Sequence, residues 1–563
     1  MKQLSGLDEL FLALERPNQC MHVAVLGVYD PGTAPGGRVR LRDIMTHMSQ
    51  RLDVSPVFRR RLVRVPFDLD RAYWVDEPKV DLEYHVRHIA LPKPGDWRQL
   101  CIQVARLHSQ ALDRAKPMWQ AYVIEGLDHV EGVPPGSFAV YIKFHHAAVD
   151  GEASGQILRA LHSLIAMPEH HAPSKPTVVD APPTAIELYT RTWGNVVPRT
   201  VRLWHAMATA TLKVTSLATE SLYKRLSSGS AWKDDFLSAL GWPRTNLPSR
   251  FGEAVSSRRI VEGVSFEMAG IHQIRKWVGG ATINDVFLTI AGGAVRRYLK
   301  TCGDAIDEAF AAAVPAGQRD TLPGGDLGNR INYSRVPLHP HIEDPLQRLA
   351  AIRHEAVQHK QAADVIGRDL VKLLADELPT KASLAIAQRL LPEYLNTVMS
   401  TVRGPDVPLY FAGAQLKRYY PMNVVMDGLG LNIAGFSYCD HLSATVVSCR
   451  KMMPDPELFA TCMRASFEEL LSAVKAEESA QLTMLEQRPV RRNSDKAAGA
   501  PISSHTRRPR KRAAATLPVR LHVAKTSPDA TAVSEAASTS TVAEALTEDR
   551  PYIVIANKRG GIQ

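Results

Sequence analysis

No run of about 18 or more apolar residues, the length a helix needs to cross a bilayer, occurs anywhere in this sequence of 563 residues. The N-terminus, MKQLSGLDEL, also lacks the apolar core of a secretion signal. We therefore expect a cytoplasmic protein without a membrane-spanning segment. With 45% hydrophobic and 22% charged residues, the composition is that of a globular protein with several domain-sized units.

Cysteine is scarce, and none of it forms a C-x-x-C pair. This scatter argues against a disulfide framework and against a zinc site. We expect reduced, mostly buried thiols, no metal centre and no bound cofactor. The six cysteines are Cys20, Cys101, Cys302, Cys439, Cys449 and Cys462.

Most of the chain also lacks an excess of positive charge. The formal net charge is +10, but residues 488–512 hold nine basic residues and one acidic residue, whereas residues 513–563 hold five of each. Residues 1–487 are therefore nearly neutral and offer no footprint for nucleic acid. From about residue 486 the chain is rich in Ala, Ser, Thr and Arg, which predicts a disordered tail. The basic stretch could attract anionic lipid headgroups, bind nucleic acid or have no role.

Strand-like and helix-like patterns alternate along the body, which predicts an α/β protein. A Pro-rich stretch at residues 168–183 separates two halves. We divide the chain into an N-terminal domain (1–183), a helical connector (184–258), a C-terminal domain (259–476) and a terminal segment (477–563). The clearest expected elements are strands at 21–30, 137–144, 431–438 and 442–449, and helices after residues 99, 151, 282 and 454.

The most informative motif is HHAAVDG at residues 145–151, where an apolar strand ends and a helix begins. An imidazole has an ordinary pKa of about 6.5, so it can accept and return a proton near neutral pH. We interpret His146 as a general base that deprotonates an alcohol. The alcohol oxygen would then attack an acyl thioester directly, without a Ser or Cys nucleophile.

Other readings of the motif stay open. Adjacent residues on an extended strand point to opposite sides, so His145 and His146 are a poor pair of metal ligands. His145 fits a supporting role better. Asp150 either orients His146 or pairs with an arginine such as those at 59–61, and Gly151 allows close backbone approach at the turn.

Five further segments, taken in order with this motif, complete a recognisable pattern. The sequence resembles the bacterial wax ester synthase/acyl-CoA:diacylglycerol acyltransferase family over about residues 4–476. The segments that carry the resemblance are LSGLDELFLAL (4–14), RAKPMWQAYVIEGL (114–127), HHAAVDG (145–151), GATINDVFLTIAGGAVRRYL (280–299), LGNRINYSRVPL (327–338) and MDGLGLNIAGFSY (426–438).

The resemblance implies two subdomains with the fold of chloramphenicol acetyltransferase and of condensation domains, facing each other across a central tunnel. It implies transfer of a fatty acyl group from CoA, as co-substrate, to diacylglycerol or a long-chain alcohol. In this reading His146 is the base and Asp150 is chiefly structural. Pro117 and Trp119 match a motif thought to shape the acyl pocket, and Asn284 and Asp285 match an Asn-Asp motif near the active site.

The residues themselves allow simpler roles for several of these positions. Asp285, three residues after Thr282, fits a helix-capping box. Asn284 either has no role beyond its place in the first turn of the helix or donates its side-chain N–H to a developing oxyanion. By residue type Trp119 fits a core better than a pocket, and Pro117 fits a turn.

Three departures from the family pattern concern substrate range and efficiency rather than reaction class. Met118 replaces the usual Leu, and Thr401 and Arg403 stand where the family has Asn and Pro. Residues 313–320 are less apolar than expected. The alternatives to the main hypothesis are a same-fold acyltransferase with another donor or acceptor, and an inactive lipid-binding homologue.

Water-insoluble substrates imply peripheral contact with the inner membrane surface or with lipid inclusions. The connector mixes Trp and Val with Arg at residues 191–204, a composition compatible with a lipid interface. The alternative is an ordinary helix packed across the two halves.

Overall fold

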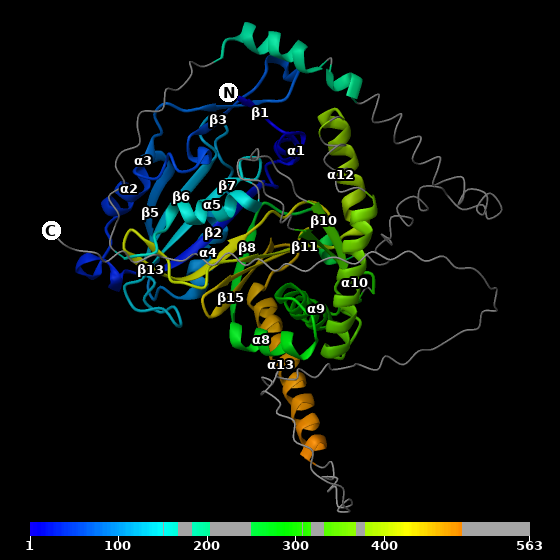
Figure 1. Ribbon diagram of the computed structural model, residues 1–563. Helices are drawn as coiled ribbons and strands as arrows, with labels where there is room; N and C mark the ends of the chain where they lie inside the picture. The colour runs from blue at the N-terminus through cyan, green and yellow to red at the C-terminus, as the bar shows by residue number, and fades with distance from the viewer. Residues whose placement is uncertain are drawn as a thin grey trace, which may run out of the picture. The chain divides into compact units, whose positions relative to one another are not determined.

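The computed structural model describes residues 1–149, 151–166, 183–196, 198–202, 249–306, 308–316, 332–366, 376 and 378–486 (Figure 1). All of them belong to one compact unit, residues 1–506. The predicted Pro-rich boundary, most of the connector and the predicted disordered tail lie outside the described residues, as does Asp150. The domain limits therefore stay predictions.

The first of two large sheets carries the strand that ends at the histidine pair. Its order is β12-β13-β2-β7-β6-β5. In that order the strands are Tyr410–Phe411, Ala414–Met422, His22–Asp30, Phe138–His145, Trp119–Glu125 and Val86–Ala90.

The second large sheet has the order β10-β9-β11-β14-β15-β8, and a small sheet has the order β1-β4-β3. The strands of the second sheet, in that order, are Asn332–Pro337, Ala311–Ala316, Thr397–Arg403, Asn432–Tyr438, His441–Cys449 and Arg259–Glu267. Those of the small sheet are Lys2–Gln3, Tyr73–Asp76 and Arg60–Val63.

Helices pack against both large sheets. In the first half they are α1 (Gly6–Leu14), α2 (Leu41–Ser49), α3 (Leu82–His85), α4 (Trp97–His108) and α5 (Gly151–Leu161). In the second half they are α8 (Met268–Trp277), α9 (Ile283–Cys302), α10 (Pro345–Ile366), α12 (Thr380–Tyr394) and α13 (Pro456–Glu486).

The strongly patterned elements agree with the sequence predictions. The apolar run at 21–30 forms β2, and β14 and β15 pair antiparallel as expected. Helix α9 begins with the predicted capping box: the Asp285 N–H donates to the Thr282 hydroxyl at 3.2 Å, and the Thr282 N–H donates to the Asp285 carboxylate at 2.8 Å. These outcomes follow from local signals, because periodicity and caps need no distant partner.

One strand crosses the division between the halves. Strand β13 lies far along the chain but pairs antiparallel with β2, with Tyr420 opposite Leu26. Figure 1 shows it in yellow beside the blue and cyan strands of the first sheet. A division of the chain at residue 259 would separate β13 from the sheet to which it belongs. This strand joins the second half to the sheet that carries the histidine pair.

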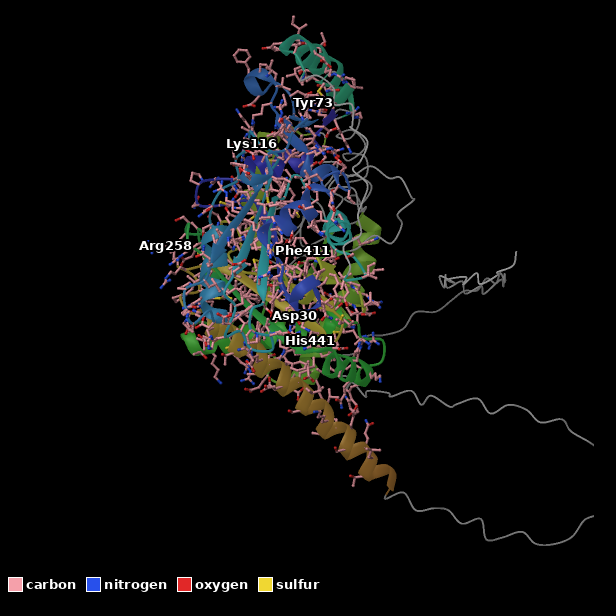
Figure 2. The ribbon with its side chains drawn as sticks, turned by 90° about the vertical axis from the view of Figure 1, so that its left-hand side faces the viewer. Asp30, Tyr73, Lys116, Arg258, Phe411 and His441 are labelled. Carbon is pink, nitrogen blue, oxygen red and sulfur yellow. The ribbon has the colours of Figure 1, made fainter. Side chains whose placement is uncertain are left out.

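A shared core joins the halves further. Leu26 and Tyr141 of the first sheet belong to the same buried apolar cluster as Val104 of α4, Phe287 of α9 and Val446 of β15. The side chains drawn in Figure 2 fill the space between sheets and helices. Close packing of this kind resists small displacements, so it fixes the strands that carry the site.

Two expectations drawn from what the sequence lacks can be compared with the described residues. None of the described helices is both long enough and apolar enough to cross a bilayer. All six cysteines are free thiols, and four of them are buried, as predicted.

Candidate active site

The histidine pair lies where the central strand β7 ends, and backbone hydrogen bonds hold it from both sides. The His146 N–H donates to the Met21 carbonyl at 2.8 Å, just before β2. The His145 N–H donates to the Met118 carbonyl at 3.0 Å, just before β6. Since both neighbours are strands of the same sheet, the backbone of the pair has little freedom to shift.

The ring of His145 is buried, and the structure fixes its tautomer. Its Nδ1 accepts the N–H of Ala147 at 3.1 Å, so the neutral ring carries its proton on Nε2. That Nε2 lies 3.5 Å from a carboxylate oxygen of Glu15. His145 therefore supports the turn after β7, as the supporting interpretation predicts.

Glu15, at the end of α1, gathers several polar side chains. Its other carboxylate oxygen lies 3.6 Å from Nε2 of His22. The Arg114 guanidinium donates through Nε, at 2.9 Å, to the oxygen that faces His145. Burial alone would raise the pKa of Glu15, but its interactions with His145 and His22 and the hydrogen bond from Arg114 together lower it. Glu15, whose side chain is 9% exposed, thus links the end of α1 to the start of β2 at His22 and to the end of β7 at His145.

Helix α1 also reaches His146. Ser5 and Asp8 form a capping box that starts the helix, with the Asp8 N–H 3.1 Å from the Ser5 hydroxyl. One turn before Glu15, the ring of Phe11 stacks on the ring of His146, with centroids 4.0 Å apart and an interplanar angle of 13°. A single helix therefore positions both histidines, one by stacking and one by charge.

The surroundings of His146 are apolar, and its ring is only 8% exposed. A buried apolar cluster beside it combines residues of both halves, including Leu14, Met118 and Val424. Burial lowers the pKa of His146 to about 4, because an imidazolium ion loses its hydration there. At neutral pH the ring is therefore the unprotonated base that the sequence interpretation requires.

The alternative interpretation, a metal site, can be tested at the polar cluster around Glu15. Ligand atoms of Glu15, Cys20 and His22 lie within 4.8 Å of one another. Arg114 already neutralises the carboxylate, and burial raises the pKa of the Cys20 thiol, which disfavours the thiolate that a metal needs. These residues do not favour a cation, and His146 is not among them.

The segment 117–119 separates two environments. Trp119 is fully buried in a core: its indole donates to the Phe58 carbonyl at 3.0 Å, and its ring stacks on His85 at 4.4 Å. Met118 belongs to the apolar cluster beside Phe11. Pro117 lines a surface cavity. The contribution of Pro117 and Trp119 to acyl binding stays a prediction.

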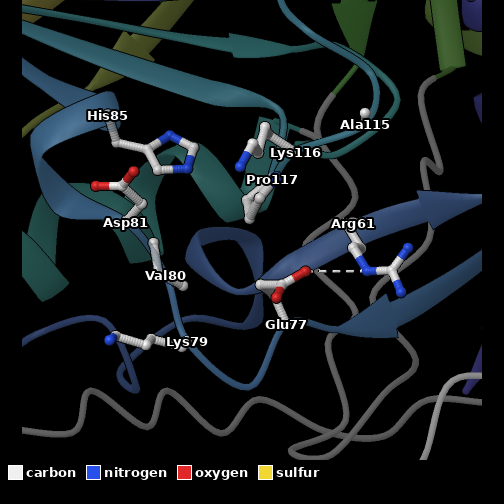
Figure 3. Close-up of a pocket in the computed structure, with 9 residues that line it drawn as sticks. All are labelled: Arg61, Glu77, Lys79, Val80, Asp81, His85, Ala115, Lys116 and Pro117. Carbon is white, nitrogen blue, oxygen red and sulfur yellow. Dashed lines mark ion pairs between the residues drawn. The ribbon is translucent and has the colours of Figure 1, made fainter.

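That cavity has a volume of about 150 Å³ and a mainly polar lining (Figure 3). Three cationic side chains, Arg61, Lys79 and Lys116, face two carboxylates, Glu77 and Asp81. Arg61 is paired with Glu77 at 3.0 Å. Figure 3 shows Lys116 and Lys79 on different sides of the cavity without an ion pair to the other residues drawn. The chemistry of this lining suits an anionic group.

The remaining predicted site residues lie on or near helix starts. Gly151 begins α5. Asp285 is 6% exposed and serves the cap of α9, so its local structure is explained without a substrate. Asn284 is half-buried in the first turn of α9, and no described contact links it to His146. A direct role for Asn284 stays a prediction.

The departures from the family pattern can be located in part. Arg403, at the end of β11, is exposed and pairs with Asp406 at 2.9 Å. Thr401 lies on the same strand with its hydroxyl buried. The arginines that were candidate partners of Asp150 each have a nearby acid: Arg59 pairs with Asp53, and Arg60 lies 3.7 Å from Asp76.

Comparison with known proteins decides the family. A model of the wax ester synthase/diacylglycerol acyltransferase catalytic domain matches residues 4–287, and the model of the corresponding C-terminal domain matches residues 327–471. The chain belongs to this family.

The sequences of related proteins match this chain over most of its length. An O-acyltransferase WSD from Acinetobacter baylyi is 33% identical over 464 residues, covering 81% of this chain and 93% of the relative. A putative diacylglycerol O-acyltransferase from Mycobacterium tuberculosis is 32% identical over 477 residues, covering 84% and 100%. This wax ester synthase/diacylglycerol acyltransferase family member is therefore an acyltransferase.

A solved structure supports the fold. The wax ester synthase/diacylglycerol acyltransferase from Marinobacter aquaeolei VT8 superimposes with a TM-score of 0.60 at 24% identity, covering 84% of this chain and all of that one. The predicted α/β acyltransferase fold is confirmed, whereas the tunnel between the subdomains stays a prediction.

Sequence reasoning missed Phe11 and Glu15 as site residues. Their segment was part of the family resemblance, but it received no chemical role. The available signal was the spacing Ser5, Asp8, Phe11, Glu15, which places a cap, an aromatic ring and a carboxylate along one short helix. Nothing in the sequence shows which distant strand those side chains meet.

We predict that Glu15→Gln lowers kcat more than it raises KM, because it removes the charge that orients His145 and Arg114 without touching substrate. It should also lower the free energy of unfolding by roughly 1–3 kcal/mol, the usual cost of losing a charged hydrogen bond. Steady-state kinetics and denaturant unfolding measure both effects. The exposed Glu131→Gln is the matched control, and wild-type kcat in Glu15→Gln would disprove the positioning role.

The lowered pKa of His146 gives a second prediction. A base must be unprotonated to act, so a pKa of about 4 extends activity of the free enzyme to lower pH than an ordinary histidine would. We expect kcat/KM to stay nearly constant from neutral pH down to about pH 5. Circular dichroism at each pH controls for unfolding. An acid limb centred near 6.5 in folded enzyme would contradict this.

Proposed function

We propose that the protein is an acyl-CoA-dependent O-acyltransferase that esterifies diacylglycerol, a long-chain alcohol or both, with His146 as general base. The observation that supports this proposal most is the neutral, buried imidazole of His146 at the end of β7, which stacks on Phe11 beside an apolar cluster. The description of the family, wax ester synthase/diacylglycerol acyltransferase, and the name of one relative, a putative diacylglycerol O-acyltransferase, support the acceptors. The products are triacylglycerol and wax esters.

In the proposed reaction His146 accepts the hydroxyl proton of the acceptor while the oxygen forms a bond to the thioester carbon. The tetrahedral intermediate then breaks its C–S bond, and the imidazolium returns the proton to the CoA thiolate. Burial makes the imidazolium unfavourable, so the proton is passed on rather than held. No covalent acyl-enzyme is needed, and the proposal requires no metal or bound cofactor.

For the oxyanion, the proposal assigns the amide of Asn284. Its neighbour Asp285 is held in the cap of α9, which restricts the backbone of Asn284. The positive end of a 20-residue helix would add to the stabilisation of negative charge.

The proposed donor, acyl-CoA, carries phosphates, and the lysines that line the surface cavity supply positive charge. Pro117 lines the cavity, and the next residue, Met118, belongs to the apolar cluster beside Phe11 and accepts the His145 N–H. The backbone at Pro117 and Met118 therefore borders both the cavity and the cluster beside the histidine pair, which supports this cavity as the proposed donor site. We propose that Lys79 and Lys116 contact those phosphates.

The enzyme's acceptors are water-insoluble in this proposal, so it works at the inner membrane surface or at lipid inclusions as a peripheral protein. The basic residues of 488–512 would add attraction to anionic headgroups, screened by salt.

The function is tested by thiol release from a radiolabelled acyl-CoA with a panel of acceptors. We expect labelled ester with diacylglycerol or fatty alcohol, and a fall of about 100-fold or more in His146→Ala. The exposed His129→Ala should behave as wild type. Release only with an amine or another acceptor would favour the alternative transferase, and no release with any acceptor would favour an inactive lipid-binding homologue.

Donor recognition is tested separately. Lys79→Ala and Lys116→Ala should raise KM for acyl-CoA severalfold and leave kcat unchanged. Neither should alter KM for an acyl thioester of N-acetylcysteamine, which lacks phosphates. Lys300→Ala, an exposed position at the end of α9, is the control. Equal effects on both thioesters would contradict a phosphate contact.

A further inference from the structure

Part of the connector forms a helix with two unlike faces. Residues 185–196 and 198–202 are helical, and the inner face is tied to the first half. The Asn195 amide donates to the Asp70 carboxylate at 3.0 Å and to the Tyr73 hydroxyl at 2.8 Å, and Arg199 pairs with Asp70 at 3.0 Å. Leu188, two turns before Asn195, packs with Val65 and Tyr73. The orientation of this helix is therefore fixed.

The opposite face of the same helix is apolar and exposed. Ile186 and Trp193 are seven residues apart in the helical segment 185–196, which places them on one side, and Val201 is exposed in the segment 198–202. Ile186 precedes the inward Leu188 by two residues, about 200° around the helix. Their exposed fractions are 75% for Ile186, 72% for Trp193 and 52% for Val201. A helix fixed by one face thus presents a second apolar face outward.

A loop beside this helix adds two more apolar side chains. Phe67 is 87% exposed and Leu69 is 55% exposed. Phe67 adopts a positive φ of 59°, which is unusual for a bulky residue and is the kind of local cost that is kept at functional positions. The residues that flank the loop, Val65 and Asp70, are the ones that contact the inner face of the helix.

The loop and the helix are in contact, and each presents exposed apolar side chains to the solvent. In Figure 1 the helix is the teal element at the top, and in Figure 2 it lies just above the label of Tyr73, beside the blue turn of the loop. We call this surface the apolar face. It consists of Phe67, Leu69, Ile186, Trp193 and Val201.

We propose that the apolar face inserts into a lipid surface and delivers the enzyme to its acceptor. This inference rests on the proposed use of a lipid acceptor and adds the residues that make contact. Trp, Phe and Ile with flanking arginines are the composition of interfacial segments, and Arg64 and Arg191 are exposed beside the face. Exposed apolar patches of this kind are uncommon on soluble proteins without a partner.

Charge distinguishes this face from the basic stretch near the C-terminus. Arg64 is already paired with Asp68 at 3.0 Å, and Arg191 with Glu187 at 3.1 Å. The face therefore has little net charge of its own, and its attraction to lipid is apolar. Binding through it should occur on neutral vesicles and persist in high salt.

The experiment uses the full chain and vesicles of phosphatidylcholine containing diacylglycerol, measured by co-sedimentation in high salt. Phe67→Ser and Trp193→Ser should each weaken binding by about tenfold, the cost of losing one inserted aromatic ring. Leu482→Ser on α13, where the side chain is also 61% exposed, is the matched control and should bind as wild type. Vesicles with phosphatidylglycerol at low salt report the electrostatic contribution separately.

Turnover separates this inference from the proposed function. Ester formation with a water-soluble short-chain alcohol should be unchanged in Phe67→Ser and Trp193→Ser, whereas esterification of vesicle diacylglycerol should fall with binding. Normal soluble turnover with unchanged vesicle binding would overturn the apolar face alone. Absence of soluble turnover in the wild type would overturn the proposed function instead.

If Trp193→Ser converts a dimer to a monomer in sedimentation velocity without altering vesicle binding, the face contacts a second copy and the lipid proposal is wrong.

Discussion

The site depends first on the backbone hydrogen bonds that hold the end of β7 between its two neighbours. Met21 and Met118 accept the N–H groups of His146 and His145, so the pair is fixed by a central position in a sheet rather than by a loop. Helix α1 adds the second constraint, because Phe11 and Glu15 each engage one of the two rings. Two histidines that are adjacent in sequence thereby acquire different roles: one supports the turn, and the other faces the apolar cluster.

Burial sets the chemistry of the pair. Lys143, on the same face of β7 as His145, donates to the carbonyls of Leu107 and Gln110, and burial lowers its pKa to about 8. His145 has a carboxylate oxygen of Glu15 3.5 Å from its Nε2, so both polar side chains of this row lie beside polar groups. The ring of His146 stacks on Phe11 beside the apolar cluster, and its burial favours the neutral form. The same low polarity that keeps the base unprotonated would also strengthen any interaction with a developing oxyanion.

The sequence predicted what local patterns determine. The strand before the histidine motif, the capping box of Thr282 and Asp285 and the paired strands β14 and β15 each have a signal within a few residues. It did not predict that β13 joins the first sheet, that Glu15 meets His145 or that Phe67 is exposed beside the connector helix. These features depend on contacts between residues far apart in the chain, for which a single sequence carries no periodic signal. Trp119, assigned to the substrate by resemblance and to a core by its residue type, lies in the core.

The central claim is that His146 is a neutral base in the folded enzyme because its site is apolar. Nitrogen-15 NMR of histidine-labelled protein, with the resonance assigned by its loss in His146→Gln, measures the protonation of this ring directly. The account predicts that the ring remains neutral at pH 5.5 while exposed histidines become charged. A His146 resonance that titrates near pH 6.5 along with the exposed histidines would contradict it.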